Sequence, residues 1–98
     1  MKIVYKNKSL EKVCTNYDEA RKKYNDKMAM KIHQRIDEIT AIDTVENLIK
    51  YRLGRCHLLK GNRQGQYAMD LVQPYRLIFE KNGDEIQIAK VIEINDYH

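Results

Sequence analysis

The chain has 98 residues with a formal net charge of +4, and 43% of its residues are hydrophobic and 33% charged. This size and composition predict one small basic domain with one modest core over residues 1–98, and exclude a multidomain protein or a disordered segment. No apolar run exceeds three residues and no apolar segment follows Met1 and Lys2, which predicts a cytoplasmic protein without a transmembrane helix or a secretory signal.

The sequence begins with the pattern of a short strand and a helix. Ile3–Tyr5 is a candidate edge strand, and Ser9 can cap a helix that follows it. The apolar residues of that helix share one face: Leu10, Val13, Cys14, Tyr17, Ala20 and Tyr24. Because Asn25 tolerates the left-handed conformation, we expect the helix to end there as one continuous element.

A second and a third helix follow. The second is predicted to begin at Asp26, and its apolar residues again share one face: Met28, Ile32, Ile36 and Ile39. Asp43 with Glu46 three residues later is a variant of the capping box, which predicts a short third helix. Its apolar residues are Val45, Leu48 and Ile49.

After Arg55 the hydrophobic period drops to two, which is typical of strands. Residues 67–71 and 75–80 alternate in this way, and Gln73-Pro74 supplies the turn between them. Asn82-Gly83 predicts a two-residue hairpin to a last strand that begins near Glu85. The apolar face of that strand is Ile86, Ile88, Ile92 and Ile94, and Lys90 interrupts it, either at a bulge or where the buried part of the strand ends.

Helices followed by antiparallel strands predict the α+β class. We expect an N-terminal helical hairpin to pack on one face of a mostly antiparallel, curved sheet. The uncovered face of the sheet is then the place for a functional site.

Positive and ionisable side chains gather just before the strands. Arg55, His57, Lys60 and Arg63 lie within nine residues that contain no acidic residue. This pattern indicates an anion-binding surface, or alternatively a solvated basic edge that discourages strand pairing. Arg76 lies on the strand face opposite Tyr75, Leu77 and Phe79, where it can clamp a phosphate or pair with a carboxylate such as Asp70 or Glu80.

The sequence ends in Asp96-Tyr97-His98, which is either a frayed polar tail or part of a site. Together with the basic cluster it supplies two imidazoles, several cations, a phenol and a carboxylate. Cleavage of RNA by its own 2′-hydroxyl needs a base for that hydroxyl, cations for the phosphorane oxygens and an acid for the leaving 5′-oxygen. Histidine suits either proton-transfer role near neutral pH.

Three motifs carry a family resemblance: residues 57–67, the segment Pro74–Phe79 and the final Asp-Tyr-His. In order and spacing they resemble the HigB toxins of the RelE/ParE superfamily, whereas the N-terminal helices agree only in pattern. The resemblance implies a RelE-like fold and a bacterial type II toxin, a ribosome-dependent endoribonuclease that cuts mRNA in the A site and inhibits translation.

The resemblance also implies a site and partners. Carried over to this sequence, the active-site groups are His57, Lys60, Arg76, Asp96, Tyr97 and His98, with Arg55, Arg63, Lys60 and Arg76 binding RNA. By their chemistry, either histidine can be the base or the acid, Tyr97 can position or stack on a nucleotide, and Asp96 can orient an imidazole. The implied partners are the ribosome, mRNA and a HigA-like helix-turn-helix antitoxin, with operator DNA bound only through the antitoxin complex.

The nearest alternative shares the expected fold, because ParE-like relatives bind DNA gyrase and cleave nothing. The grouped imidazoles and cations favour cleavage.

Cys14 and Cys56 have neither a C-x-x-C spacing nor a surrounding His or Cys cluster, so we expect reduced thiols and no metal site or cofactor.

Overall fold

The computed structural model describes residues 1–96, which form five strands and four α-helices joined by short connections. The four helices follow one another between the first strand and the second. The helices are α1 (Lys8–Thr15), α2 (Tyr17–Lys23), α3 (Asp26–Ala41) and α4 (Val45–Lys50). The strands are β1 (Lys2–Tyr5), β2 (His57–Leu58), β3 (Gln66–Asp70), β4 (Tyr75–Asn82) and β5 (Ile88–Asp96). Over residues 1–96 no helix has the length and apolar character that crossing a membrane requires.

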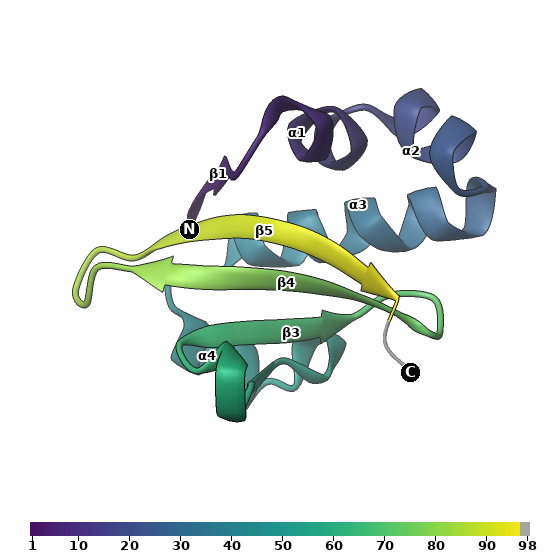
Figure 1. The fold of residues 1–98 in the computed structure, drawn as a ribbon. Helices are drawn as coiled ribbons and strands as arrows, with labels where there is room; N and C mark the ends of the chain where they lie inside the picture. Colours follow the sequence, from purple (N-terminus) through teal and green to yellow (C-terminus); the bar gives the residue numbers. More distant parts are fainter. Residues whose placement is uncertain (97–98) are drawn as a thin grey trace.

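The strands form one sheet in the order β1-β5-β4-β3-β2 (Figure 1). β1 is the predicted edge strand and lies parallel to β5, while the other neighbouring pairs are antiparallel. The sheet is strongly curved, as the bend of β5 in Figure 1 shows. The predicted α+β class and the mostly antiparallel sheet are therefore confirmed.

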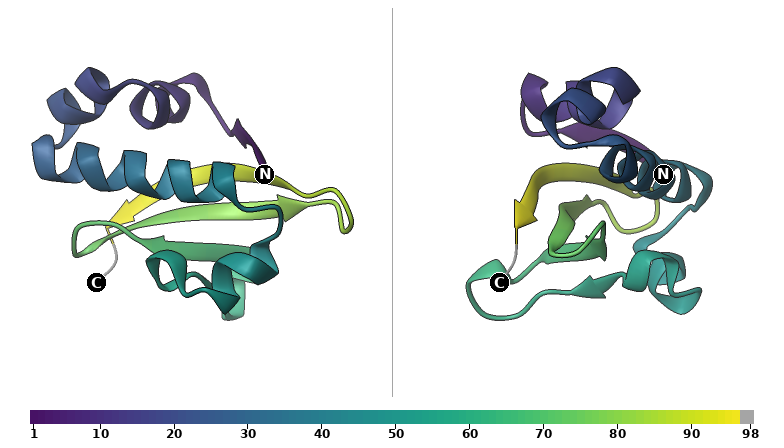
Figure 2. Two further views of the ribbon diagram at one scale, coloured as in Figure 1. Left: turned by 180° about the vertical axis from the view of Figure 1, so that it is seen from behind. Right: turned by 90° about the vertical axis from the view of Figure 1, so that its right-hand side faces the viewer.

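The helices cover one face of this sheet. Figure 2 shows α3 lying across the back of the strands, with α1 and α2 running back over α3 as a helical layer. The core lies between α3 and the sheet, where Ile32, Ile39, Leu77 and Phe79 are fully buried. The opposite face of β4 carries no α-helix in Figure 1, which leaves it available for a site.

The two cysteines belong to the core and are free thiols. Cys14 is 1% exposed and Cys56 is 5% exposed. Burial raises the pKa of each thiol from 9.0 to about 12, because the thiolate is disfavoured away from water. Cys14, which the sequence places on the apolar face of the first helix, thus lies in the core as that pattern predicts.

The predicted continuous helix from Ser9 to Tyr24 is wrong, because Asn16 divides it into α1 and α2. Asn16 has extended backbone angles, and its side chain accepts a hydrogen bond from the Glu19 amide at 3.2 Å. Asn7 caps α1 in the same way, which corrects the assignment to Ser9. An asparagine cap ends one helix and begins the next because its short side chain competes for backbone amides.

Two other capping predictions are also wrong. Asn25 is extended, with φ −173, and its side chain accepts from the Met28 amide at 2.8 Å, so it begins α3 instead of ending α2 in the left-handed region. Thr44 is the cap of α4, where its hydroxyl accepts from the Asn47 amide, and Asp43 precedes it. The predicted start of α3 at Asp26 is correct, and the short third helix predicted from the sequence is present as α4.

The last strand differs from its prediction in two ways. β4 extends to Asn82 and pairs there with Ile88, so residues 83–87 form the connection and the two-residue hairpin is wrong. In β5 the register shifts by one residue: Phe79 lies opposite Val91, Ile78 lies opposite Glu93, and Ile92 is the extra residue of a bulge. The bulge is therefore at Ile92 and not at Lys90.

This bulge also changes which residues of β5 point to the core: odd-numbered positions do so before it and an even-numbered position after it. The core residues of the strand are Ala89 and Val91 before the bulge and Ile94 after it, whereas Ile86 is 86% exposed and precedes the strand. The predicted apolar face, built from four isoleucines, is correct only at Ile94.

Candidate functional site

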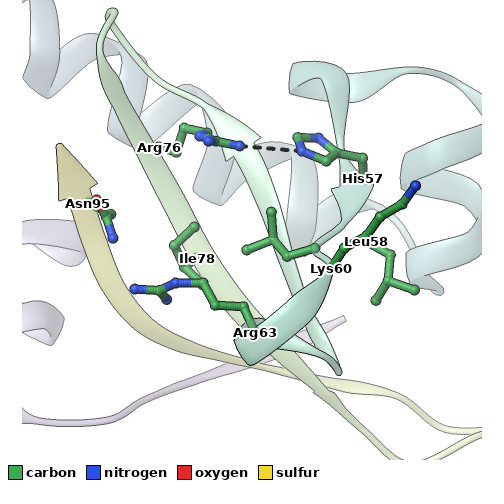
Figure 3. A pocket seen from close by; sticks show the side chains of 8 residues that line it. His57, Leu58, Lys60, Arg63, Arg76, Ile78 and Asn95 are labelled. Carbon is green, nitrogen blue, oxygen red and sulfur yellow. Dashed lines mark hydrogen bonds between the residues drawn. The ribbon is translucent and has the colours of Figure 1, made fainter. Parts of the chain in front are cut away.

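A pocket of about 340 Å³ opens on the sheet face opposite the core (Figure 3). Its walls come from β2 and the residues after it, from η2 (a 3₁₀ turn, Gly61–Arg63), from β4 and from the end of β5. The lining residues are His57, Leu58, Leu59, Lys60, Arg63, Arg76, Ile78 and Asn95. Three members of the predicted basic cluster, His57, Lys60 and Arg63, thus line the same pocket as Arg76.

Strand alternation places Arg76 in this pocket. Leu77 and Phe79 on the same strand are fully buried against the helices, so Arg76 and Ile78 point to the other face. Across the antiparallel ladder, Arg76 lies opposite Asn95, which brings the end of β5 to the same pocket. The prediction that Arg76 lies opposite the aromatic core face is correct.

His57 is held between two groups at the rim of the pocket. Its Nδ1 atom is 2.9 Å from the backbone oxygen of Arg55. Its Nε2 atom is 3.4 Å from Nη1 of Arg76, the contact drawn as a dashed line in Figure 3. A ring nitrogen of His57 and a guanidinium therefore face the same space, as a site for a phosphate and a transferable proton requires.

The other cations of the predicted cluster differ in their surroundings. Arg63 lines the pocket and forms an ion pair with Glu93, and it also donates to Gln66 Oε1 at 3.0 Å. Lys60 is exposed and extends on the other side of His57 from Arg76 in the view of Figure 3. Both residues supply positive charge to an open pocket, although that of Arg63 is partly neutralised.

Arg55 lies beside the pocket and does not line it. Its Nε and Nη2 atoms donate to the two carboxylate oxygens of Asp70 at 2.7 and 3.0 Å. These hydrogen bonds, and the charge of the carboxylate, raise the pKa of Arg55. Arg55 shares a second surface hollow with Ile49, Arg52, Cys56 and His57. The predicted RNA-binding role of Arg55 therefore requires RNA to extend beyond the main pocket.

The predicted C-terminal group is described only in part. Asp96 is the last residue of β5, lies opposite Tyr75 and follows Asn95, which lines the pocket. Tyr97 and His98 lie outside the described residues. Over residues 1–96 the structure contains no group of three or more His, Cys, Asp or Glu side chains placed to hold a metal ion.

Three further residues of this region, Asn95, Ile78 and Asp70, were not predicted from the sequence as parts of it. Asn95 was obscured by the bulge in β5, which changes the face to which the residue belongs. Asp70 was considered only as a partner of Arg76, which lies opposite it in the β3–β4 ladder. Its side chain is bound by Arg55 instead, and the acid-free run from Arg55 to Arg63 gave no signal of this contact.

The sequence matches no protein-family model and no curated protein. Solved structures match the fold. A YoeB/ParE toxin from Agrobacterium tumefaciens is 19% identical with a TM-score of 0.60, and 100% of both chains is covered. The fold is that of the YoeB toxins. A YoeB–YefM complex and a YoeB dimer from Staphylococcus aureus match at 20% and 19% identity, each with a TM-score of 0.55, 100% coverage of this chain and 97% of theirs.

These matches confirm the fold expected from the resemblance, an α+β toxin fold of the RelE type. The solved structures are described as YoeB or YoeB/ParE toxins, so the narrower resemblance to HigB stays a prediction. The motifs that carry it are in residues 57–79 and at the end of the chain.

Proposed function

We propose that this chain is a single-domain toxin of a type II toxin–antitoxin system that cleaves mRNA in the ribosomal A site. The observation that carries the proposal is the pocket in which His57 and Arg76 face each other, with Lys60 and Arg63 at its edge. A cationic pocket with an imidazole suits a scissile phosphate and its neighbouring hydroxyl. The YoeB-like fold supports a toxin.

In the proposed reaction the 2′-oxygen of RNA attacks the adjacent phosphorus. His57 takes the proton of the 2′-hydroxyl, the bond from the 2′-oxygen to phosphorus forms, and the bond to the 5′-oxygen breaks. Arg76 and Lys60 stabilise the charge on the phosphorane oxygens. His98 donates a proton to the leaving 5′-oxygen, Asp96 orients that imidazole and Tyr97 stacks on a nucleotide. The products are a 2′,3′-cyclic phosphate and a 5′-hydroxyl.

The small pocket contacts few nucleotides, so it provides little binding energy to align a free RNA. We propose that the ribosome provides this alignment.

Two of the matched solved structures are YoeB–YefM assemblies, one described as heterotetrameric. By analogy we propose a cognate antitoxin for this chain, of the HigA-like helix-turn-helix type, with operator DNA bound through that complex. The place of action is the cytoplasm.

The test is a purified translation system programmed with a defined mRNA, with cleavage mapped by primer extension. We expect the wild type to produce breaks in the A-site codon only when ribosomes are present, and His57→Ala to produce none. The matched control is His33→Ala, which removes an imidazole on α3 outside the pocket and should leave cleavage intact. His98→Ala tests the C-terminal group in the same assay. Breaks by folded His57→Ala at the wild-type rate would refute the proposal.

A second candidate is a toxin that binds DNA gyrase and cleaves nothing. It is favoured by one observation, the description of the Agrobacterium tumefaciens structure as a YoeB/ParE toxin. The discriminating assay is supercoiling of plasmid DNA by purified gyrase. Inhibition of supercoiling together with intact mRNA on ribosomes would select the gyrase-binding function, whereas ribosome-dependent breaks with unaffected supercoiling would select the nuclease.

A further inference from the structure

The two neighbours of His57 both specify the same tautomer of its neutral ring. A backbone carbonyl oxygen can only accept a hydrogen bond, so the contact with Arg55 requires a proton on Nδ1. A guanidinium can only donate, so the contact with Arg76 requires a lone pair on Nε2. The result is a ring with Nδ1–H toward the backbone and an Nε2 lone pair toward the pocket.

The carbonyl that accepts the hydrogen bond from Nδ1–H belongs to an unusual backbone segment. Arg55 has φ +53, in the left-handed region that few residues other than glycine adopt. Arg52 and Gly54 are also left-handed, with φ values of +56 and +57. Such a segment keeps its shape only where surrounding contacts hold it. The position of the Arg55 carbonyl therefore depends on what holds Arg55.

Asp70 is the group that holds Arg55. Its carboxylate accepts two hydrogen bonds from the guanidinium, at 2.7 and 3.0 Å, in the fork-to-fork geometry that fixes both position and angle. The Asp70 side chain is 19% exposed and the Arg55 side chain is 67% exposed, so the carboxylate is the more firmly enclosed partner.

Asp70 is itself anchored to the core side of the molecule. Its backbone oxygen accepts a hydrogen bond from Nε of Arg35 at 2.6 Å. Arg35 is 8% exposed and also binds Glu38 at 3.0 Å within α3. A continuous series of contacts therefore leads from α3 through the end of β3 to the loop before β2.

We propose that Asp70 is a positioning residue that, through Arg55, holds His57 in the Nδ1–H tautomer. The catalytic meaning of this tautomer depends on the proposed function: an Nε2 lone pair that faces the pocket is what takes the proton of the 2′-hydroxyl. The 3.4 Å contact of Nε2 with Arg76 is at the long end of hydrogen bonding, so a bound phosphate can draw the guanidinium away and free the lone pair.

The test reads the tautomer directly. The imidazole ¹⁵N shifts of His57 are measured by long-range ¹H–¹⁵N correlation at pH 8 in the uniformly labelled wild type, Asp70→Asn and Glu93→Gln. We expect Nδ1–H in the wild type and a shift toward the Nε2–H form in Asp70→Asn. Glu93→Gln is the matched control, because it removes a carboxylate from Arg63 with the same change of charge. It should leave the tautomer unchanged.

Cleavage on ribosomes gives the second measurement. We expect kcat of Asp70→Asn to fall about 10–100-fold, the usual effect of removing a group that orients another, with a smaller change in KM. The amide ¹H–¹⁵N spectrum establishes that the variant is folded. Arg55→Gln, which breaks the same link from the other side, replaces Asp70→Asn if that variant does not fold.

The outcomes separate this inference from the proposed function. An Nε2–H ring in the wild type overturns the inference, and so does a His57 tautomer that is unchanged in both folded Asp70→Asn and Arg55→Gln. The expected tautomer shift together with no cleavage by the wild type supports the positioning role of Asp70 and refutes the nuclease.

Discussion

Gly54→Ala is expected to destabilise the fold far more than an alanine at another left-handed glycine. Gly54 has φ +57, a conformation that costs an alanine about 1–2 kcal/mol. A Cβ atom there would lie 2.5 Å from Nε and 2.7 Å from Cδ of Arg35, so the side chain has to move. Arg35 is buried and bound to both Asp70 and Glu38. Breaking such a buried pair costs about 3–5 kcal/mol, which gives an upper total of about 4–7 kcal/mol.

The matched control is Gly61→Ala, because Gly61 has φ +70 and no atom within 4 Å of the added methyl group. It should show only the conformational cost, about 1–2 kcal/mol. Urea unfolding followed by circular dichroism measures both variants, and Tm provides a second reading, since 1 kcal/mol lowers Tm by about 4–8 °C in a domain of this size. Equal destabilisation by the two substitutions would show that Arg35 is not held as the structure indicates.

Three further predictions concern the core, the thiols and the pocket. Phe79→Ala should lower the free energy of unfolding by about 3–5 kcal/mol because the ring is fully buried, while Met30→Ala, at 64% exposure, should change it by less than about 0.5 kcal/mol. Burial raises the pKa of Cys14 and Cys56 from 9.0 to about 12, so their contribution to stability is complete below pH 9 and is lost as the pH rises toward 12. Urea midpoints measured from pH 8 to pH 11 should therefore decline. Lys60→Ala should lower ribosome-dependent cleavage about 10²-fold, as loss of a charge-stabilising group does.

Each of these predictions has a control. Lys22→Ala removes the same charge from exposed α2 and should preserve the cleavage rate. Replacing both cysteines by alanine should remove their part of the alkaline decline, and an unchanged decline would assign it to other groups such as Tyr5, whose pKa burial also raises to about 12. A Phe79→Ala variant as stable as Met30→Ala would contradict the position of the core.

The fold was predictable where local pattern and tertiary packing agree. The period of two in residues 67–71 and 75–80 identified β3 and β4, because successive side chains of a strand point to opposite faces and only one face of each strand packs against the helices. The break between α1 and α2 was missed because the apolar stripe continues across Asn16, and stripe continuity does not reveal a cap. The recurrence of asparagine at positions 7, 16 and 25, each of which caps a helix, was the available signal.

The candidate site was predictable as a set of residue types but not as a geometry. His57 and Arg76 were selected for their chemistry, and the pocket brings them to within 3.4 Å of each other. The pairing of Arg55 with Asp70 joins residues 15 positions apart, and nothing in a local pattern shows which of two nearby arginines a carboxylate binds. The roles of Tyr97 and His98 remain predictions from sequence.

The extra residue at Ile92 decides which side chains of β5 face outward. Before it, odd-numbered positions such as Val91 point to the helices; after it, Asn95 points to the pocket and Ile94 to the helices. Because side chains otherwise alternate along a strand, deleting Ile92 would remove the bulge and keep Glu93 and Asn95 outward and Ile94 inward, whereas deleting a second residue would reverse them. Loss of the single bulge residue therefore preserves the inward and outward positions of β5, and loss of a pair that includes it exchanges them.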